Sequence, residues 1–532
     1  MTINHQACIS LRSIRNQNEQ KELNATIMKI LKPGSHTTTK CSRKFVLLAI
    51  FPIVLLFSFT NPFQALDIQE GDSVEIFCAD LNQRIPKLMN FYDIPGVNIS
   101  IIKQGQIIWT QAYGYADLET GQMMTPDTYL RVQSISKSVT AWGVMKLVEQ
   151  GKIDLDRPVQ QYLKTWTFPE SAFSESNVTV RQLLSHTAGM PLGDFFNFYS
   201  PESDIPTLRE SLTKEAVLFQ EPGSSFFYSN TGFNLLELLI EEVTDRDFAE
   251  YMQQEILIPL GMLHSSFTWN KQFDPPVPLG YGLTGKAVPV YIYPEKGSGG
   301  LFATVGDIAA FVASGMPGFS KNQHVLNPQS IHQLYTPIAH HLGLYSLVFD
   351  SYGFGHYIEN LSNGKKAVSH GGQGTGWMTH FHAVPESGDG IVILTNSQRS
   401  WPLIAHLLMD WAKWNGFIKV GMGRILWGIK LMWGLMVVIG SLSLWNLWQW
   451  GVALMRGGRK FAPLSKEFRL LRIGQATLFM VTSAGLLWCL NQDYLFISSV
   501  FPLVSDWLGI SLFAFAIVML LLALFPKKVS LV

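Results

Sequence analysis

Three long apolar stretches near the C-terminus most strongly constrain what this chain of 532 residues can fold into. They cover residues 431–454, 474–490 and 507–525. Each is close to the roughly 20 apolar residues that a helix needs to cross a bilayer. We therefore predict three transmembrane helices in a C-terminal domain, residues 421–532. The alternative is a set of buried helices in a soluble domain.

A further stretch without charged residues, 45–66, follows Lys40, Arg43 and Lys44. A basic flank before an apolar segment is typical of a signal peptide or a signal anchor. The polar, basic tail of residues 1–44 is long for a signal peptide, and Phe63-Gln64-Ala65 lacks the small residue usually found two positions before the last residue of a cleavage site. We favour an uncleaved anchor, and cleavage stays open.

Basic residues indicate the orientation of these segments. The loop after the first C-terminal stretch carries Arg456, Arg459, Lys460, Lys466, Arg469 and Arg472. The loop after the second stretch carries Asp493 and Asp506 and no basic residue. Because loops rich in lysine and arginine stay in the cytoplasm, residues 67–420 are predicted to face the outside of a cell membrane.

The middle part, residues 67–420, has ordinary globular composition and requires a separate explanation. The net charge of the whole chain is zero and no long basic run occurs in this part, so nucleic acid is excluded as a partner. Only one of the four cysteines, Cys78, lies in residues 67–420, so a disulfide within this domain is excluded.

Strand patterns lie at both ends of this domain. Residues 96–103 and 106–113 flank Gln104-Gly105 as a hairpin, and residues 378–384 and 391–396 form a similar pair. Helical spacing follows Ser134 and Asn230. The pattern predicts an α+β fold in which the two ends of the domain meet in one antiparallel sheet flanked by helices.

The first chemical motif is Ser134-Ile135-Ser136-Lys137 at the start of a predicted helix. Residues three apart share one helix face, so the amine of Lys137 can reach the hydroxyl of Ser134. A serine becomes a good nucleophile when a nearby base takes its proton, and a lysine can do this when its pKa is lowered. We predict Ser134 as the nucleophile and Lys137 as its partner.

The same spacing occurs in Ser362-Asn363-Gly364-Lys365. Asn-Gly marks a turn between strands, which would not hold the lysine over the serine. We therefore interpret this second motif as a chance match.

Two further motifs could complete a site. Tyr228-Ser229-Asn230 lies just before a helix and would present a phenol and an amide to one cleft, although a buried tyrosine and a helix-capping asparagine would explain it equally. His370-Gly371-Gly372-Gln373 precedes a strand, and its glycines would let a substrate approach the strand edge.

Taken in this order, the three motifs resemble the signature of the serine beta-lactamase and penicillin-binding-protein superfamily. The similarity is greatest to the class C beta-lactamase branch, which includes D-aminopeptidases and esterases, and it extends over residues 85–397. It implies a transpeptidase-like sheet with flanking helices and an α-helical subdomain.

The resemblance also implies a role for each residue. Ser134 would form an acyl-enzyme, Lys137 and Tyr228 would transfer its proton, and Asn230 would bind the substrate amide. The backbone N–H groups of Ser134 and Gln373 would form the oxyanion hole, with His370 and Gly372 lining the substrate site. Because His370 stands where beta-lactamases carry a lysine, efficient beta-lactam hydrolysis is not expected.

We expect an outward-facing serine hydrolase that acts on an ester or a D-amino-acid peptide, without a cofactor or a metal. The alternative is a catalytically silent receptor or scaffold that signals through its membrane helices, and a membrane partner protein stays open. His186 is interpreted as structural, holding a turn. His380 and His382 share one strand face without a third ligand, so we predict no metal site there.

Overall fold

The computed structural model describes residues 68–194, 198–320, 323–417, 420–492 and 495–527. The predicted tail, 1–44, and the predicted signal segment, 45–66, lie outside the described residues. The boundaries assigned to the four parts of the chain therefore stay predictions.

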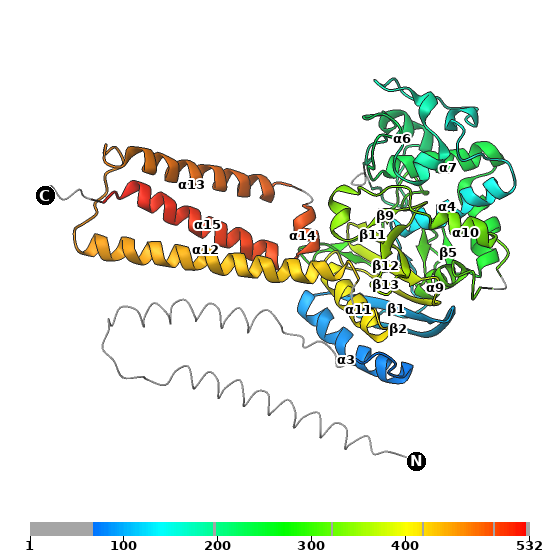
Figure 1. Cartoon of the computed structure of the whole chain (residues 1–532), viewed down its shortest axis with the longest axis horizontal. Coiled ribbons are helices and arrows are strands. Elements are labelled where there is room, and N and C mark those ends of the chain that lie inside the picture. Colours follow the sequence, from blue (N-terminus) through cyan, green and yellow to red (C-terminus); the bar gives the residue numbers. More distant parts are fainter. Residues whose placement is uncertain (1–67, 195–197, 321–322, 418–419, 493–494, 528–532) are drawn as a thin grey trace, which may run out of the picture. The chain divides into compact units, whose positions relative to one another are not determined.

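An eight-stranded antiparallel sheet forms the centre of the middle domain (Figure 1). Its strands, in spatial order, are β3 (Gln122–Met123), β2 (Gln106–Asp117), β1 (Gly96–Lys103), β13 (Asp389–Thr395), β12 (Trp377–Val384), β11 (Lys366–Gly374), β10 (Tyr357–Asn360) and β9 (Ser351–Tyr352). Strand β1 pairs with β13 over six residue pairs from Val97↔Thr395 to Ile102↔Gly390. The prediction that the two ends of the domain meet in one sheet is confirmed.

Alternating residues of the central strands supply two separate cores. Ile391 and Ile393 of β13 pack into one core with helices α3 (Val74–Tyr92) and α11 (Trp401–Trp414). Val392 and Leu394 pack into the other, with α4 (Ile135–Glu149), α7 (Asn230–Thr244) and α9 (Val305–Ser314). Because successive side chains of a strand point to opposite faces, the sheet is covered by helices on both sides.

Short elements build the helical subdomain beside the sheet. These are α5 (Val180–Leu184), α6 (Leu208–Glu215), α8 (Phe248–Met252) and α10 (Pro328–Leu334), with the small sheet β4 (Leu130–Arg131), β8 (Phe302–Ala303) and β5 (Ser265–Ser266), and the pair β6 (Gly280–Tyr281) and β7 (Ala287–Val288). The α+β class, the sheet with flanking helices and the helical subdomain are all confirmed.

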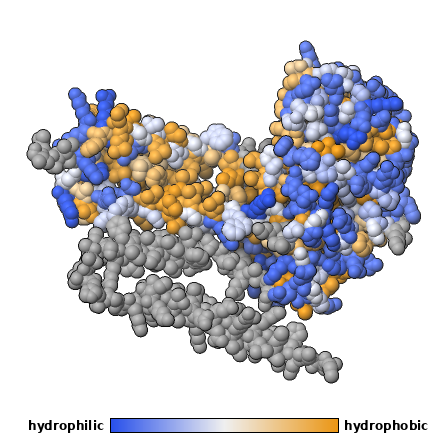
Figure 2. Space-filling model, viewed as in Figure 1, coloured by the Kyte–Doolittle hydropathy of each residue, from blue (hydrophilic) through white to orange (hydrophobic). Residues whose placement is uncertain are grey.

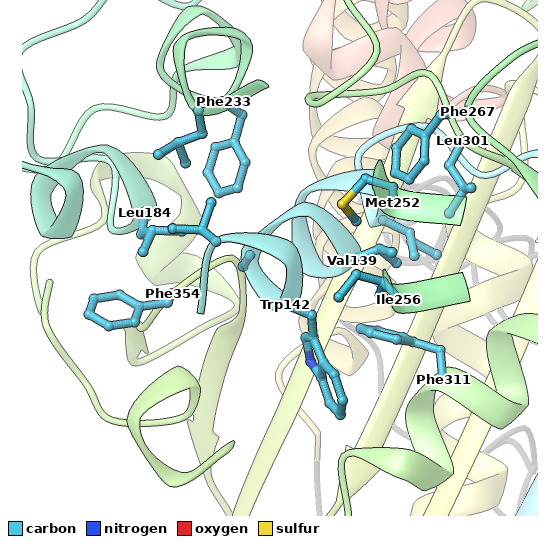
Figure 3. Packing of buried hydrophobic residues seen from close by; sticks show 14 of the residues in the cluster. Val139, Trp142, Leu184, Phe233, Met252, Ile256, Phe267, Leu301, Phe311 and Phe354 are labelled. Carbon is cyan, nitrogen blue, oxygen red and sulfur yellow. The ribbon is translucent and has the colours of Figure 1, made fainter. Parts of the chain in front are cut away.

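Helix α4 occupies the centre of the larger core (Figure 3). Val139 and Trp142 extend from it towards Met252, Ile256 and Phe311, and the ring of Trp142 meets that of Phe311 edge-on, with centroids 5.5 Å apart. A helix surrounded in this way has little freedom to move, so the residues at its N-terminus are held rigidly.

Three C-terminal helices are long and apolar enough to cross a membrane: α12 (Gly423–Met455), α13 (Arg469–Leu490) and α15 (Val504–Leu524). The short α14 (Phe496–Val500) precedes α15. Figure 2 shows hydrophobic side chains over the surface of this region, whereas hydrophilic residues predominate on the surface of the sheet domain. The three predicted apolar helices are present, and α12 begins eight residues before the predicted span.

Candidate active site

Ser134 lies at the junction between strand β4 and helix α4. Gln133 adopts a positive φ of 53°, which turns the chain sharply before the helix begins. From Leu130 to Met145 every residue is buried except Ser134, which is partly exposed. The fold thus presents one hydroxyl from an otherwise buried segment.

Lys137 lies one turn further along α4 and is fully buried. Its Nζ lies 3.2 Å from Ser134 Oγ, 2.7 Å from Asn230 Oδ1 and 2.8 Å from the Ser298 carbonyl oxygen. The predicted reach of the amine to Ser134 is therefore present.

These three neighbours match the valences of a neutral amine. Asn230 Oδ1 and the Ser298 carbonyl oxygen can only accept hydrogen bonds, so they take the two N–H bonds of an uncharged amine. As an ammonium, Lys137 donates its third hydrogen to Ser134 Oγ; once the amine is neutral, its lone pair faces Ser134 Oγ, whose hydroxyl can donate to it. The arrangement suits a base that removes the serine proton.

The surroundings of Lys137 favour that neutral form. Burial lowers the pKa of the Lys137 amine well below its usual value. The ring centroids of Tyr228 and Phe233 lie 4.9 and 5.8 Å from Nζ, and their attraction for the ammonium form opposes part of this effect. Removing an ammonium group from water costs free energy, so the buried amine holds its proton weakly.

Tyr228 faces the same space from the segment before α7. Burial raises the pKa of its phenol well above the usual value, the nearby Tyr345 adds to this, and a hydrogen bond with Ser134 opposes it. A phenol with a raised pKa stays protonated near neutral pH and serves as a proton donor. Of the two groups, Lys137 is therefore the better base.

Asn230 is the first residue of α7, yet it does not cap the helix. The cap is Ser229, whose Oγ accepts from the Gly232 backbone N–H at 2.8 Å and donates to the Pro191 carbonyl oxygen at 2.6 Å. The alternative explanation of Asn230 as a capping residue is wrong, because its side-chain oxygen bonds to Lys137.

His186 positions the Tyr228 segment. The backbone N–H of Ser229 donates to His186 Nδ1 at 3.2 Å, and that of Phe227 donates to the His186 carbonyl oxygen at 2.8 Å. The imidazole centroid lies 4.5 Å from that of Tyr228. His186 is itself at a turn with a φ of 59°, in line with the structural role predicted for it.

The Ser298 carbonyl is a part of the site that sequence reasoning missed. Its loop is held by Glu237 of α7, whose Oε2 accepts from the backbone N–H groups of Lys296 and Gly297, each at 2.6 Å. Burial raises the pKa of the Glu237 carboxyl to about 8. A backbone acceptor leaves no residue signature, and the available signal was a glutamate, Glu237, between apolar residues of α7.

Strand β11 carries the third motif. Its glycine Gly372 comes so close to the Val132 carbonyl oxygen and Thr379 Oγ1 that a side chain there would clash with both. Thr379 Oγ1 also donates to the Val132 carbonyl at 2.7 Å. The glycine thus lets β11 lie directly against the segment that leads into Ser134.

His370 lies on the same strand and is buried, at 1% exposure. Its Nδ1 lies 2.8 Å from the Gly371 carbonyl oxygen, so it carries the hydrogen, and Nε2 accepts from the Tyr352 hydroxyl at 3.3 Å. Burial lowers the pKa of His370 well below the usual value, and Lys137 lowers it further. A neutral imidazole whose centroid lies 6.2 Å from that of Tyr228 supports the position of the phenol.

Gln373 connects β11 to two other elements. Its Oε1 accepts from Trp401 Nε1 of α11 at 3.1 Å, and its Nε2 donates to Ser499 Oγ of α14 at 3.1 Å. The predicted roles of its backbone N–H and of His370, Gly372 and Asn230 towards substrate stay predictions.

The remaining candidates lie on a turn and a strand that carry none of the predicted site residues, although His380 of β12 is paired with Gly371 of β11. Ser362 belongs to a turn between β10 and β11, as predicted, with Gly364 at a φ of 81°. His380 and His382 are buried on β12 with their rings 5.9 Å apart, beside Trp401 and Trp411 of α11.

Residues 81–406 match the family model described as beta-lactamase. The chain belongs to the beta-lactamase family. All the residues brought together here, from Ser134 to Gln373, fall within the matched region of this serine hydrolase family.

Two relatives and two solved structures illustrate the relationship. The chain is 31% identical over 205 residues to protein flp of Staphylococcus aureus, covering 38% of this chain and 40% of that one. It is 25% identical over 334 residues to the human mitochondrial serine beta-lactamase-like protein LACTB, covering 46% and 59%. The matched region is thus less than two thirds of either relative.

Among solved structures, the octameric penicillin-binding protein homologue of Pyrococcus abyssi is 29% identical, with a TM-score of 0.54 and coverage of 64% of this chain and 80% of that one. EstCE1, a hydrolase with promiscuous acyltransferase activity, is 21% identical with a TM-score of 0.55, covering 64% and 99%, and shows the beta-lactamase-family fold alone.

Proposed function

We propose that the protein is a membrane-anchored serine hydrolase whose outward-facing domain cleaves an ester or a D-amino-acid peptide through an acyl-enzyme on Ser134. The observation that carries this proposal is the environment of Lys137. Its amine is buried, has two fixed acceptors for its hydrogens and lies 3.2 Å from the Ser134 hydroxyl.

In the acylation step, the Lys137 amine takes the Ser134 proton as Oγ attacks the substrate carbonyl. The negative charge that develops on the carbonyl oxygen is stabilised by the backbone N–H groups of Ser134 and Gln373. The Tyr228 phenol gives its proton to the leaving alcohol or amine and regains one from Lys137. Water then attacks the acyl-enzyme by the same route in reverse, which releases the acid and restores Ser134.

The replacement of a lysine by His370 supports a substrate other than a beta-lactam. A buried neutral imidazole offers no fixed positive charge to a substrate carboxylate. Penicillins are expected to acylate Ser134 slowly, and a neutral ester to react faster.

Membrane anchoring is supported by three helices that are long and apolar enough to cross a bilayer. The basic loop between α12 and α13 supports a cytoplasmic position for that loop, and hence an outward-facing catalytic domain in a multi-pass protein.

Mass spectrometry tests the acyl-enzyme. The full chain is exposed to a fluorescent penicillin and, separately, to p-nitrophenyl butyrate, alongside Ser134→Ala and Ser362→Ala. Ser362 is the matched control, because it has the same spacing to a lysine without the helix. We expect an adduct or ester turnover in the wild type and in Ser362→Ala, and neither in Ser134→Ala.

If the folded wild type showed no adduct and no turnover, that result would contradict a hydrolase. The silent receptor would then be the better explanation, with the contact between Gln373 and Ser499 as its route from the cleft to the membrane segment.

A further inference from the structure

The short helix η5 (Gly343–Leu347) has one side towards the active site and another towards solvent. The ring of Tyr345 lies 5.6 Å from that of Tyr228. Leu344 and Leu347, on either side of it, are 69% and 64% exposed. Apolar side chains exposed together in one short segment beside an active site are a feature of surfaces that bind a partner or a membrane.

The first turn of α12 is bonded directly to this helix. Arg424 Nη1 donates to the Leu347 carbonyl oxygen at 3.0 Å. The backbone N–H of Gly421 donates to Glu359 Oε1 of β10 at 2.6 Å, and Gly421 lies so close to the Val348 carbonyl oxygen that a side chain would clash. The helix that leads into the bilayer therefore starts at η5, which forms the rim of the active site.

The cleft has a second attachment to the membrane region. Ser499 of α14, which lies between the second and third apolar helices, accepts from Gln373 of β11 at 3.1 Å. Val500 of α14 is buried in the same core as α11 and the sheet. Two segments of the C-terminal region are thus bonded to the active-site domain: α14 to strand β11, and the start of α12 to η5.

The distance along α12 from Arg424 to the start of the apolar run indicates how far the rim lies from the hydrocarbon core of a bilayer. At 1.5 Å per residue, Leu431, where the apolar run begins, lies about 10 Å along the helix from Arg424. Trp427 between them is 70% exposed, and the amine of Lys430 lies 5.2 Å from its ring. Tryptophan and lysine are typical of the interface between lipid and water. The rim lies within reach of the lipid headgroups, which extend several ångströms beyond the hydrocarbon core.

We propose that this hydrolase takes its substrate from the bilayer surface: an amphiphile whose acyl chain stays in the near leaflet and whose ester or amide lies at headgroup depth. Leu344 and Leu347 rest in that surface and hold the cleft open to it. The inference rests on the proposed function, and it identifies the class of substrate. Each leucine that leaves water also contributes favourably to holding the rim against the lipid.

The test compares two esters with the same leaving group. The full chain is reconstituted in vesicles of phosphatidylcholine and phosphatidylglycerol at 3:1, and turnover of 4-methylumbelliferyl palmitate in the bilayer is divided by that of water-soluble 4-methylumbelliferyl acetate. The double variant Leu344→Asp/Leu347→Asp is compared with Leu263→Asp. Leu263 is a matched control, since it is 64% exposed and lies between η4 (Ile258–Leu260) and β5.

We expect the ratio to fall at least tenfold in the double variant and to stay within twofold of wild type in Leu263→Asp. An unchanged ratio in the double variant, or an equal fall in the control, would overturn the inference while acetate turnover still supported the hydrolase. If the wild type hydrolysed neither ester faster than Ser134→Ala, the proposed function would fail, and the inference with it.

Discussion

Helices α4 and α13 are both rich in apolar residues, but those of α4 are mostly buried and those of α13 are mostly exposed. In α4 nearly every side chain is buried, including the polar Ser136, Lys137 and Thr140. In α13, whose residues are all described, the single buried side chain is Arg472. Apolar content does not by itself predict burial, because protein covers the one helix, whereas the other is exposed and is long and apolar enough to cross a membrane.

The basic residue that each helix buries shows what the difference means. Lys137 meets an amide oxygen and one carbonyl oxygen, and its pKa falls. Arg472 donates to four carbonyl oxygens, those of Ala462, Pro463, Ser465 and Ala523. An arginine stays charged in proteins, so it can only fasten chain segments, whereas a lysine with few partners can exchange a proton.

Lys137→Arg tests that distinction with the largest expected effect. A permanently charged guanidinium cannot take the Ser134 proton, so kcat for a soluble ester should fall about 1,000-fold or more. Stopped assays with p-nitrophenyl butyrate measure the change. Arg472→Lys is the counterpart in α13 and should leave kcat within about twofold; a similar loss in both variants would break the comparison.

A matched pair of tryptophans tests the difference in burial. Trp142 of α4 is fully buried, whereas Trp488 of α13 is 61% exposed. Trp142→Ala should lower the free energy of unfolding by about 3–5 kcal/mol. Trp488→Ala should change it by less than about 0.5 kcal/mol. Denaturant unfolding in detergent micelles measures both, and equal losses would show that α13 is packed against protein.

The pH dependence of activity sharpens the comparison on the side of α4. Below its lowered pKa, Lys137 holds a proton and cannot accept another, so kcat/KM should rise with pH, about tenfold per unit, until the amine is neutral. The rise should end well below the pKa of about 10.4 of a free lysine. A profile that kept rising to that value would show a solvated, ordinary amine.

Glu237 should have the smallest effect, because it acts through the loop that carries the Ser298 carbonyl. Glu237→Ala should lower kcat about tenfold with KM nearly constant, since the misplaced carbonyl contacts the amine of Lys137 and not the substrate. Glu237→Gln keeps an oxygen acceptor and should restore most of the rate. A change in KM alone would assign Glu237 to substrate binding instead.

Local signals in the sequence were sufficient for much of this structure. The Gln104-Gly105 turn and its alternating flanks predicted the hairpin of β1 and β2, and helical spacing after Ser134 predicted α4. Apolar length predicted the three C-terminal helices. The spacing of Ser134 and Lys137 needed only the geometry of one helix turn, so their contact could be predicted as well.

The rest of the site depends on contacts between distant segments. Ser298 acts through a backbone oxygen, which any residue would supply, and Asn230 was open to a capping interpretation until Ser229 was seen to fill that position. The bond between Gln373 and Ser499 joins two parts of the chain that share no sequence pattern. Such pairings follow from tertiary packing and leave no local trace.

The pairing of β1 with β13 has a consequence for the time at which the domain can fold. Val97 of β1 can pair with Thr395 of β13 only after the ribosome has synthesised β13, so the central strand pair forms late. At roughly 5 to 20 residues per second, the ribosome takes on the order of half a minute to make the intervening chain. Through that interval β1 has an unpaired edge, so a nascent chain that stalls before β13 should be especially prone to aggregation, and α12 emerges only after the sheet can close.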